Sequence, residues 1–463
     1  MDDADAVRFG TDGWRATLDE FTLPRVRLVG RAVAAHLEDR NVAGPVAVGY
    51  DARERSREFA EALAEELAAA GRNVSVSNRD CPTPALAWTV AREAAGGLMI
   101  TASHNPPEYN GVKFVPADGA PALPAVTEDI ESRLGAVAAD PPTVPDGEHG
   151  TVENVDIVGP YVEHALDFVD ADLSGLSVVY DAMHGSGRGV TDRLLSRAGA
   201  DVTRLRCDRD PDFGGGAPEP VPERTERLVE RVTAGEADLG VVNDGDADRL
   251  GVITPERGFL DANVLLALLY EARLETEAGD AVRTVSTSSL VDRVATAHGQ
   301  AVHETAVGFK WVAEAMADHD AIVGGEESGG FGVTGHLRNK DGVLVALLVA
   351  AAATERSLDE RVETLFATHG AVHQGRVSVD CPDDRKAAVL DALGESLGES
   401  VADTPVEDVN TVDGFKIALA DGTWLLVRPS GTEPKMRVYA EATSEERVEE
   451  LLAAGRELLA AHV

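Results

Sequence analysis

The chain of 463 residues contains little cysteine, little lysine and no long apolar run. Its three cysteines, Cys81, Cys207 and Cys381, lie far apart, which excludes a disulfide framework and a CxxC metal site. A reducing, cytoplasmic setting is therefore expected. The N-terminus MDDADAV has no basic or apolar signal region, and the longest apolar run, residues 343–353, is shorter than the ~20 residues that span a bilayer. The sequence predicts neither a membrane segment nor a targeting signal.

Positive charge is also scarce, because 42 Lys and Arg residues face 81 Asp and Glu residues, for a formal net charge of -39. Nucleic acid and anionic membranes are polyanions, so neither is an expected partner. The composition resembles that of salt-in halophiles, in which molar salt shortens the Debye length to ~3 Å and weakens carboxylate repulsion. Arginine supplies most cations, and lysine is confined to Lys113, Lys310, Lys340, Lys386, Lys416 and Lys435.

Strand-like apolar runs that lead into polar loops and helical patterns recur through the chain. Residues 45–53, 177–189 and 282–289 are such runs, which predicts parallel or mixed sheets covered by helices. After Gly370 the pattern changes to alternating strands, with Asp421-Gly422 as a hairpin turn and a final helix over 444–461, typical of a smaller α+β domain. The proline-rich stretch 140–150 marks the first boundary. We expect an α/β protein with domains 1–150, 151–253, 254–370 and 371–463.

The segment TASHNPPEYNGVK carries Ser103 directly after the apolar run Leu98-Met99-Ile100. Ser103 is therefore expected where a buried strand opens into a loop, and ligands of α/β sheets bind at strand ends. Pro106 and Pro107 fix φ and remove two donors, which predicts a rigid turn instead of a helix through Ser103.

The segment NDGDADR places Asp244, Asp246 and Asp248 at alternate positions after another apolar run. Carboxylates at this spacing in a loop converge on one hard cation. An EF-hand would need glycine at loop position six and glutamate at position twelve, but Arg249 and Pro255 stand there. Calcium in an EF-hand is excluded, whereas magnesium completed by a phosphate oxygen fits. A solvated acidic turn is the alternative.

Two further segments are suited to a phosphorylated sugar. GGEESGGFG offers Glu326, Glu327 and Ser328, a weak signal for binding sugar hydroxyls, which both donate and accept hydrogen bonds. RPSGTEPKMRVY is more specific, because it combines arginine side chains, hydroxyls and open backbone N–H groups that suit a dianion. Its candidate phosphate-binding residues are Arg428, Ser430, Gly431, Thr432 and Arg437.

With the FGTDGWR motif at residues 9–15, these segments resemble the α-D-phosphohexomutase family, the phosphoglucomutases and phosphomannomutases. The resemblance extends over nearly the whole chain. It implies three related α/β/α domains with mixed sheets and a C-terminal α+β domain around a central active-site cleft. It also implies that Ser103 is a phosphoserine carrier, that Ser103, Asp244, Asp246 and Asp248 hold Mg²⁺, and that Glu326 and Ser328 bind sugar hydroxyls.

A dianionic substrate needs local cations on so acidic a protein. The motif segments supply them, although some will be ordinary surface ion pairs: Arg15, Lys113, Arg249, Lys310, Arg338, Lys340, Arg428, Lys435 and Arg437. Lys340 resembles the family's candidate general base, and Lys113 a second proton-exchange candidate. Lys386 and Lys416 lie outside the motifs and are interpreted as incidental. His104 either positions the serine phosphate or orients the loop.

The sugar loop indicates the branch of the family. Phosphomannomutase-type loops look like GEMSGH and phosphoglucosamine mutase loops like GEQSGH, whereas this chain has GEESGG, with Gly330 where the histidine would stand. Gly308 and Lys310, in VGFK, also resemble the phosphoglucomutase branch. Glucose 1-phosphate and glucose 6-phosphate are thus the expected substrates, with phosphomannomutase or phosphoglucosamine mutase activity as alternatives.

The implied reaction is two phosphoryl transfers through a hexose 1,6-bisphosphate, which also serves as activator. A metal-dependent sugar phosphatase using the same residues is the alternative from another class. A non-catalytic binding protein fits less well, because serine, aspartates and phosphate loop are all intact. The expected partner is a hexose phosphate, and the expected state is a monomer or homodimer.

Overall fold

The computed structural model describes residues 3–431, 433–460 and 462. The chain forms two compact units, which are described separately. Unit 1 contains Met1–Leu265 and Ser328–Glu360, and unit 2 contains Leu266–Glu327 and Arg361–Val463. No helix within the described ranges is long and apolar enough to cross a membrane.

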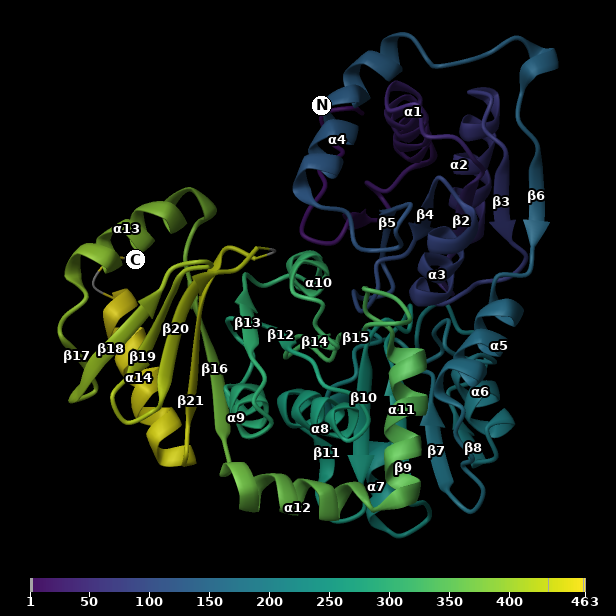
Figure 1. The fold of residues 1–463 in the computed structure, drawn as a ribbon. Coiled ribbons are helices and arrows are strands. Elements are labelled where there is room, and N and C mark those ends of the chain that lie inside the picture. The colour runs from purple at the N-terminus through teal and green to yellow at the C-terminus, as the bar shows by residue number, and fades with distance from the viewer. Residues whose placement is uncertain (1–2, 432, 461, 463) are drawn as a thin grey trace. The chain divides into compact units, whose positions relative to one another are not determined.

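The first sheet of unit 1 has six strands in the order β1-β5-β4-β2-β3-β6 (Figure 1). β4, β2, β3 and β6 run parallel, whereas β5 is antiparallel to β4 and β1. The strands are β1 (Trp14–Thr17), β2 (Val46–Tyr50), β3 (Val74–Ser77), β4 (Gly96–Ile100), β5 (Tyr109–Pro116) and β6 (Val152–Val155). Its helices are α1 (Leu23–Asp39), α2 (Ser56–Ala69), α3 (Thr83–Glu93), α4 (Pro124–Ala139) and the short 3-10 helix η1 (Asp146–Glu148).

Apolar sequence accounts for this layering. β2 and β4 are completely buried, as expected for inner strands covered by helices on both faces. α1, α2 and α4 share one core with the sheet, which includes Leu98 of β4. The neighbouring Gly97 faces α3 on the other side, because a Cβ there would lie 2.5 Å from Val90 Cγ2. Helix α3 therefore packs directly on the strand that leads to Ser103.

The second sheet of unit 1 has the order β11-β10-β9-β7-β8. β9, β7 and β8 run parallel, and β10 is antiparallel to β9 and β11. The strands are β7 (Ser177–Asp181), β8 (Asp201–Leu205), β9 (Leu239–Asn243), β10 (Leu250–Thr254) and β11 (Gly258–Leu260), with β15 (Phe331–Val333) also in this unit. The helices are α5 (Val158–Val169), α6 (Thr191–Arg197), η2 (Pro222–Arg224), α7 (Glu226–Thr233) and α11 (Gly342–Glu355).

Unit 2 begins with a parallel sheet in which β12 (Ala281–Thr284) lies between β13 (Val302–Thr305) and β14 (Val323–Gly325). The strands are accompanied by α9 (Leu290–Ala297) and α10 (Phe309–Asp318). The chain passes between the units within α8 (Ala262–Leu274) and within α12 (Leu358–His369), as well as between Glu327 and Ser328.

The C-terminal part of unit 2 is an antiparallel sheet in the order β16-β21-β20-β19-β18-β17. The strands are β16 (His373–Asp380), β17 (Ser400–Val401), β18 (Thr404–Asn410), β19 (Phe415–Leu419), β20 (Trp424–Pro429) and β21 (Lys435–Ala442). The helices are η3 (Asp383–Arg385), α13 (Lys386–Ser396) and α14 (Glu445–Ala460). α14 contributes Val448, Leu451 and Leu459 to the core that it shares with the sheet.

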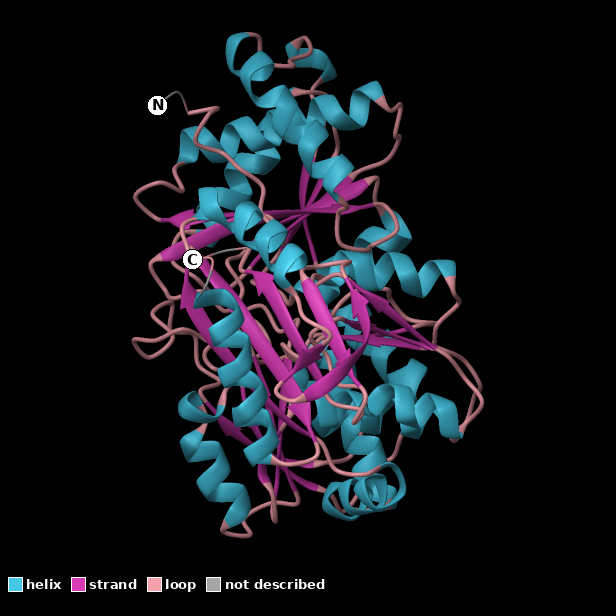
Figure 2. Ribbon diagram, turned by 90° about the vertical axis from the view of Figure 1, so that its left-hand side faces the viewer, coloured by secondary structure: helices cyan, strands magenta, loops and turns pink. Residues whose placement is uncertain are grey.

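These elements confirm the fold class expected from the sequence. Three α/β sheets with mixed or parallel strands precede an antiparallel C-terminal sheet with its own helices, and Figure 2 shows helices lying against the sheets. The hairpin turn at Asp421-Gly422 joins β19 to β20, and the final helix matches the expected range closely. The three boundaries that would separate the four expected domains remain a prediction.

Candidate active site

Ser103 lies in unit 1 just after β4, in the loop that leads to β5. Its side chain is fully buried, and its backbone has a φ of 50°, a conformation that non-glycine residues rarely adopt. The hydroxyl donates to Asp244 Oδ2 at 2.8 Å, and His104 Nδ1 lies 3.4 Å from Ser103 Oγ. The backbone N–H of Ser103 donates to Thr101 Oγ1 at 2.8 Å. Strain and buried contacts thus fix the serine beside the aspartates.

Arg53 fixes the backbone of this loop by hydrogen bonds, although the sequence analysis did not single it out. Its guanidinium is buried and ion-paired with Asp51 at 3.0 Å. The same group donates to four carbonyl oxygens of the loop, those of Ser103, Asn105, Pro106 and Tyr109. The sequence feature that could have indicated Arg53 is the YDAR segment at the end of β2, because β2 is the strand next to β4.

The three aspartates of the DGDAD loop follow β9 and are completely or almost completely buried. One carboxylate oxygen from each of Asp244, Asp246 and Asp248 lies within 4.8 Å of the others. Asp246 Oδ1 and Asp248 Oδ1 are buried without a hydrogen-bond partner. A buried, unpaired carboxylate oxygen is costly, and a hard divalent cation satisfies it. The residues therefore fit a Mg²⁺ ion, as the spacing predicted, and a solvated acidic turn is excluded by their burial.

The carboxylates in this cluster have different protonation equilibria. Burial, with the charges of Asp246 and Asp248, raises the pKa of the Asp244 carboxyl well above its usual value. Burial also disfavours the charged form of Asp246, but the ammonium of Lys113 and the hydroxyl of Thr83 outweigh it and lower the pKa of Asp246. Thr83 Oγ1 donates to Asp246 Oδ2 at 2.6 Å. The contrast arises because Asp246 contacts Lys113 and Thr83, whereas Asp244 experiences mainly the charges of the other two aspartates.

Lys113 and Lys340 supply the cations nearest to the aspartates. Lys113 Nζ lies 3.0 Å from Asp246 Oδ2 and 3.2 Å from Asp248 Oδ2, and Lys340 Nζ lies 3.0 Å from Asp248 Oδ2. Both ammonium groups also contact Asp12 Oδ2, at 3.0 and 3.4 Å. Burial favours the neutral amines, but these carboxylates outweigh it and raise the pKa of both lysines. Each is a fixed positive charge in this arrangement.

Asp12 is the second residue that sequence reasoning missed, although it stands inside the FGTDGWR motif. Besides the two lysines it accepts a hydrogen bond from Arg15 Nη2 at 2.9 Å. Arg15 Nη1 donates to Asn105 Oδ1, in the serine loop, at 2.9 Å. Asp12 therefore connects the N-terminal motif with both lysines and with the loop of Ser103.

His104 and Arg249 both border the same cluster. Burial, with the charges of Arg249 and Arg15, lowers the pKa of His104 well below its usual value, so the ring is neutral. The backbone N–H of Arg249 donates to Asp244 Oδ1 at 3.1 Å. Ser328 is half-buried and precedes Gly329 and Gly330, which pair with Leu250 and Arg249. Unit 1 thus brings Ser328 to the strand that follows the aspartates.

In unit 2, the expected sugar-binding residues other than Ser328 form a second group. Gly308 caps α10 with a φ of 124°, and its N–H donates to Glu326 Oε1 at 2.9 Å. Glu327 Oε2 accepts from Thr284 Oγ1 at 3.4 Å. Lys310 Nζ lies over the Trp311 ring, 5.6 Å from its centroid. Glu326 and Gly308 are therefore in direct contact.

The C-terminal phosphate loop is joined to this group through Asp413, a third residue that the sequence analysis missed. Asp413 Oδ2 accepts from Arg428 Nε at 2.9 Å and from the backbone N–H of Val307 at 3.1 Å. Arg428 also pairs directly across the sheet with Arg437, whose guanidinium contacts Glu433 at 2.9 Å. Because residues directly opposite each other on adjacent strands point to the same face of a sheet, the two arginines lie on one face.

The rest of the phosphate loop follows β20. Ser430 is almost fully buried, Gly431 is exposed, and Thr432 lies outside the described residues. Lys386 donates to the carbonyl oxygens of Ser430 and Glu433 at 2.6 and 2.7 Å. Interpreting Lys386 as incidental was therefore wrong, because this lysine fixes the backbone of the loop. Its distance of 44 residues from Ser430 left no signal in the sequence.

The predicted residues thus fall into two groups. Unit 1 brings together Ser103, the three aspartates, Arg15, His104, Lys113, Arg249, Ser328 and Lys340. Unit 2 contains Gly308, Lys310, Glu326, Arg428, Ser430, Gly431 and Arg437. The first group has the chemistry of a phosphoryl-transfer site with a divalent metal, and the second has the chemistry of a polyol and phosphate-binding site.

Comparisons with known proteins agree with this chemistry. Four models of the phosphoglucomutase/phosphomannomutase family match the chain, with α/β/α domain I at residues 6–139, domain II at 159–258, domain III at 261–369 and the C-terminal domain at 377–458. A protein named probable phosphoglucosamine mutase from Methanopyrus kandleri is 37% identical, over 96% of this chain and 95% of that protein. A phosphoglucomutase/phosphomannomutase from Thermococcus kodakarensis is 34% identical, over 97% and 98%.

The solved structure of a proposed phosphomannomutase from Thermus thermophilus is similar to the chain, with a TM-score of 0.84 and 33% identity. The similarity covers 98% of this chain and 99% of that one. These matches identify the class as phosphohexomutases, enzymes that isomerise hexose phosphates. The chain belongs to the phosphoglucomutase/phosphomannomutase family.

Proposed function

We propose that the protein interconverts glucose 1-phosphate and glucose 6-phosphate, with Ser103 as the phosphoryl carrier and Mg²⁺ as the cofactor. The contact that supports this most strongly is the hydrogen bond of 2.8 Å between the buried Ser103 hydroxyl and Asp244, within the aspartate cluster. Asp244, Asp246 and Asp248 would hold the metal together with a phosphate oxygen on Ser103. When bound, the metal neutralises charge on the transferring phosphoryl group.

In the proposed reaction, phospho-Ser103 gives its phosphoryl group to the free hydroxyl of the sugar monophosphate. The bond between Ser103 Oγ and phosphorus breaks, a bond between the sugar oxygen and phosphorus forms, and the proton of the sugar hydroxyl is transferred, directly or through a neighbouring group, to Ser103 Oγ. The product is a hexose 1,6-bisphosphate. Once this intermediate has turned over, its other phosphate returns to Ser103 and releases the isomeric monophosphate. Lys113 and Lys340 would balance charge near the reacting oxygens or carry the proton.

Binding of the substrate is assigned to the remaining residues. Glu326 and Ser328 would accept hydrogen bonds from sugar hydroxyls, while Gly308 and Lys310 would border the sugar. Arg428, Ser430, Gly431, Thr432 and Arg437 would bind the phosphate that does not react, because arginine side chains and open backbone N–H groups suit a dianion. Arg15, His104 and Arg249 would surround the serine phosphate.

Glucosamine phosphate is the second candidate substrate, because the Methanopyrus relative at 37% identity carries the name of a phosphoglucosamine mutase. The GEESGG loop favours glucose. Turnover of glucose, mannose and glucosamine 1-phosphates should be measured side by side with Mg²⁺ and a trace of the matching bisphosphate. The highest kcat/KM is expected for glucose 1-phosphate. Faster turnover of glucosamine 1-phosphate would contradict the substrate but retain the mutase, whereas phosphate release without isomerisation would indicate a phosphatase.

Two broader expectations are also proposals. The boundaries near residues 150, 253 and 370 are proposed to separate four domains. The net charge of -39 supports a protein adapted to concentrated salt. Mutase activity measured from low to molar KCl should then rise with salt, and an optimum at low salt would contradict this adaptation.

A further inference from the structure

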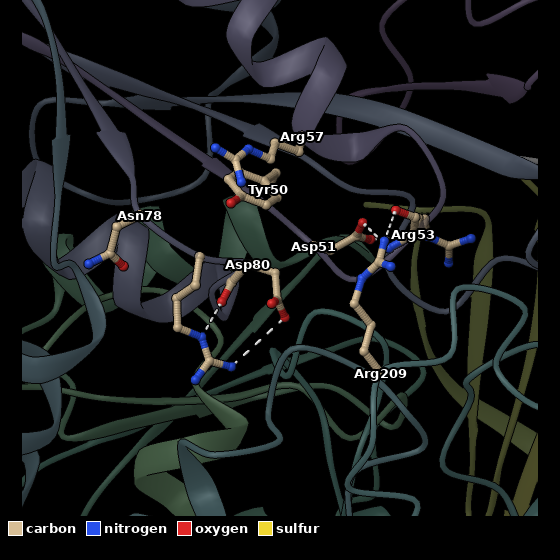
Figure 3. Close-up of a pocket in the computed structure, with 8 residues that line it drawn as sticks. Tyr50, Asp51, Arg53, Arg57, Asn78, Asp80 and Arg209 are labelled. Atoms are coloured by element: carbon tan, nitrogen blue, oxygen red, sulfur yellow. Dashed lines mark hydrogen bonds and ion pairs between the residues drawn. The ribbon is translucent and has the colours of Figure 1, made fainter.

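A positively charged cavity lies in unit 1, outside the group around Ser103. It has a volume of about 410 Å³ and is shown in Figure 3. The residues that line it come from the ends of β2 and β3, the start of α2 and the loop after β8: Tyr50, Asp51, Arg53, Arg57, Asn78, Arg79, Asp80 and Arg209. Four arginines therefore face two aspartates, in a protein whose acidic residues outnumber its basic ones about twofold.

Both aspartates in the cavity are already neutralised. Asp51 is ion-paired with the buried Arg53, and Asp80 receives two hydrogen bonds from Arg188, at 2.7 and 2.8 Å. Arg79 reaches Asp80 only at 4.0 Å, and its hydrogen bonds go to backbone oxygens. Arg209 donates to the carbonyl oxygen of Arg53 at 3.3 Å and has no carboxylate within 4.0 Å among the described residues. Arg57 is ion-paired with Glu61 at 2.9 Å, so Arg79 and Arg209 are the two lining guanidinium groups without a close carboxylate.

Neutral donors complete the cavity. Burial raises the pKa of the Tyr50 phenol, which therefore stays protonated and able to donate. In Figure 3, Tyr50 and Arg57 lie above Asp80, Asn78 lies to one side and Arg209 to the other. The Asn78 amide adds further N–H donors to the lining. Guanidinium, phenol and amide donors around one hollow match the oxygens of a phosphate group.

We propose that this cavity is an anion site for orthophosphate or the phosphate of a monoester, held by Arg79 and Arg209. It is separate from the reaction assigned to Ser103 and does not depend on that assignment. Its wall is shared with the phosphoserine loop, because Arg53 lines the cavity and donates to the carbonyl oxygens of Ser103 and Asn105. A bound anion would lie one side chain away from that loop.

Isothermal titration of the full chain with inorganic phosphate tests the proposal. The wild type should bind one more phosphate than Arg209→Gln or Arg79→Gln, or bind it at least about tenfold more tightly, because each variant loses a charge-assisted donor. Arg231→Gln, which removes a charge paired with Glu236 in the same unit, serves as the matched control and should titrate like the wild type. Unchanged stoichiometry and affinity in both cavity variants would overturn the site.

A repeat titration with glucose 6-phosphate separates the two sources. An extra site filled by both ligands indicates a monoester site, and one filled by inorganic phosphate alone indicates an orthophosphate site; either supports the proposal. A crystal of the full chain grown with tungstate provides an independent check. An anomalous peak within hydrogen-bond distance of Arg79 and Arg209 would support the site. A cavity without tungstate, at a concentration that fills the Arg428 loop, would overturn it.

Discussion

The serine and aspartate cluster of unit 1 and the phosphate loop of unit 2 handle charge in opposite ways. In unit 1, Lys113 and Lys340 are shared among several buried carboxylates, and Asp246 and Asp248 each retain an oxygen without a partner. In the phosphate loop of unit 2, both arginines are ion-paired: Arg428 with Asp413, and Arg437 with Glu433, which Lys435 also contacts.

The difference indicates what each region lacks. The unit 1 cluster leaves Asp246 Oδ1 and Asp248 Oδ1 buried without a partner, and the proposed divalent cation with a phosphate would complete it. In the unit 2 loop both guanidinium groups are already ion-paired, so a phosphate dianion would have to compete with Asp413 and Glu433 for them. Substitutions in unit 1 should therefore mainly affect chemistry and metal binding, whereas those in unit 2 should mainly affect substrate binding and retention.

The largest effect is expected at Ser103. Ser103→Ala removes the hydroxyl that would carry the phosphoryl group, so turnover should fall by roughly 10⁴-fold or more while the fold is retained. Intact-mass measurement should find a phosphate-sized adduct in the wild type and none in the variant. Ser132→Ala, an exposed serine on α4, should behave as the wild type. Near-normal turnover by Ser103→Ala would show that Ser103 does not carry the phosphoryl group, and the chemistry could then not be assigned to the unit 1 cluster.

The next largest effect concerns the carboxylate oxygens without a partner in unit 1. Asp246→Asn removes an anionic ligand and weakens the ion pair with Lys113, so kcat should fall by about 10²- to 10³-fold at fixed Mg²⁺. Excess Mg²⁺ should restore only part of the activity. The charge-matched control is Asp201→Asn, on an exposed position of β8. If chelated and retitrated Asp246→Asn matches the wild type, the aspartates do not hold the metal.

The sequence predicted the fold class because apolar periodicity and turn residues act locally. It also singled out Ser103 and the aspartates as candidates, which the structure brings together, because their spacing is preserved within single loops. The sequence analysis missed four residues: Asp12, Arg53, Asp413 and Lys386. Their partners lie far along the chain, and the contacts form only where particular strand ends become neighbours in the fold. Lys386, for instance, lies in α13 but fixes Ser430. Side-chain identity gave no indication of these contacts, which tertiary packing alone creates.

A smaller effect is expected in unit 2. Arg428→Ala removes a charge-assisted donor, so kcat/KM should fall by about 10²-fold, mostly through a higher KM. The bisphosphate should also escape into solution, because its recapture depends on the same loop. Release can be followed by phosphorus NMR of the reaction mixture. Arg376→Ala, an exposed arginine of β16, is the control. A variant that binds substrate normally and releases no bisphosphate would place the phosphate elsewhere.

The smallest expected effect tests whether the lysines of unit 1 do more than supply charge. The pKa of both Lys113 and Lys340 is raised because the charges of their aspartates outweigh the effect of burial, so each ammonium is protonated at neutral pH. Arginine keeps that charge but exchanges protons far less readily and needs more room. Lys340→Arg should therefore lower kcat by about tenfold with little change in KM, and Lys113→Arg should lower it less.

The separation of kcat from KM distinguishes the two roles of these lysines. A purely electrostatic lysine would tolerate arginine or lose substrate and metal affinity with it, whereas a proton carrier would lose kcat at saturating substrate and Mg²⁺. Glutamine at position 340 provides the complementary variant, because Lys340→Gln removes both charge and proton and should be more damaging than Lys340→Arg. If both arginine variants keep wild-type kcat across the pH range, the lysines act only as fixed charges. The proton would then leave through another group or water, and unit 1 would differ from unit 2 in its charge balance alone.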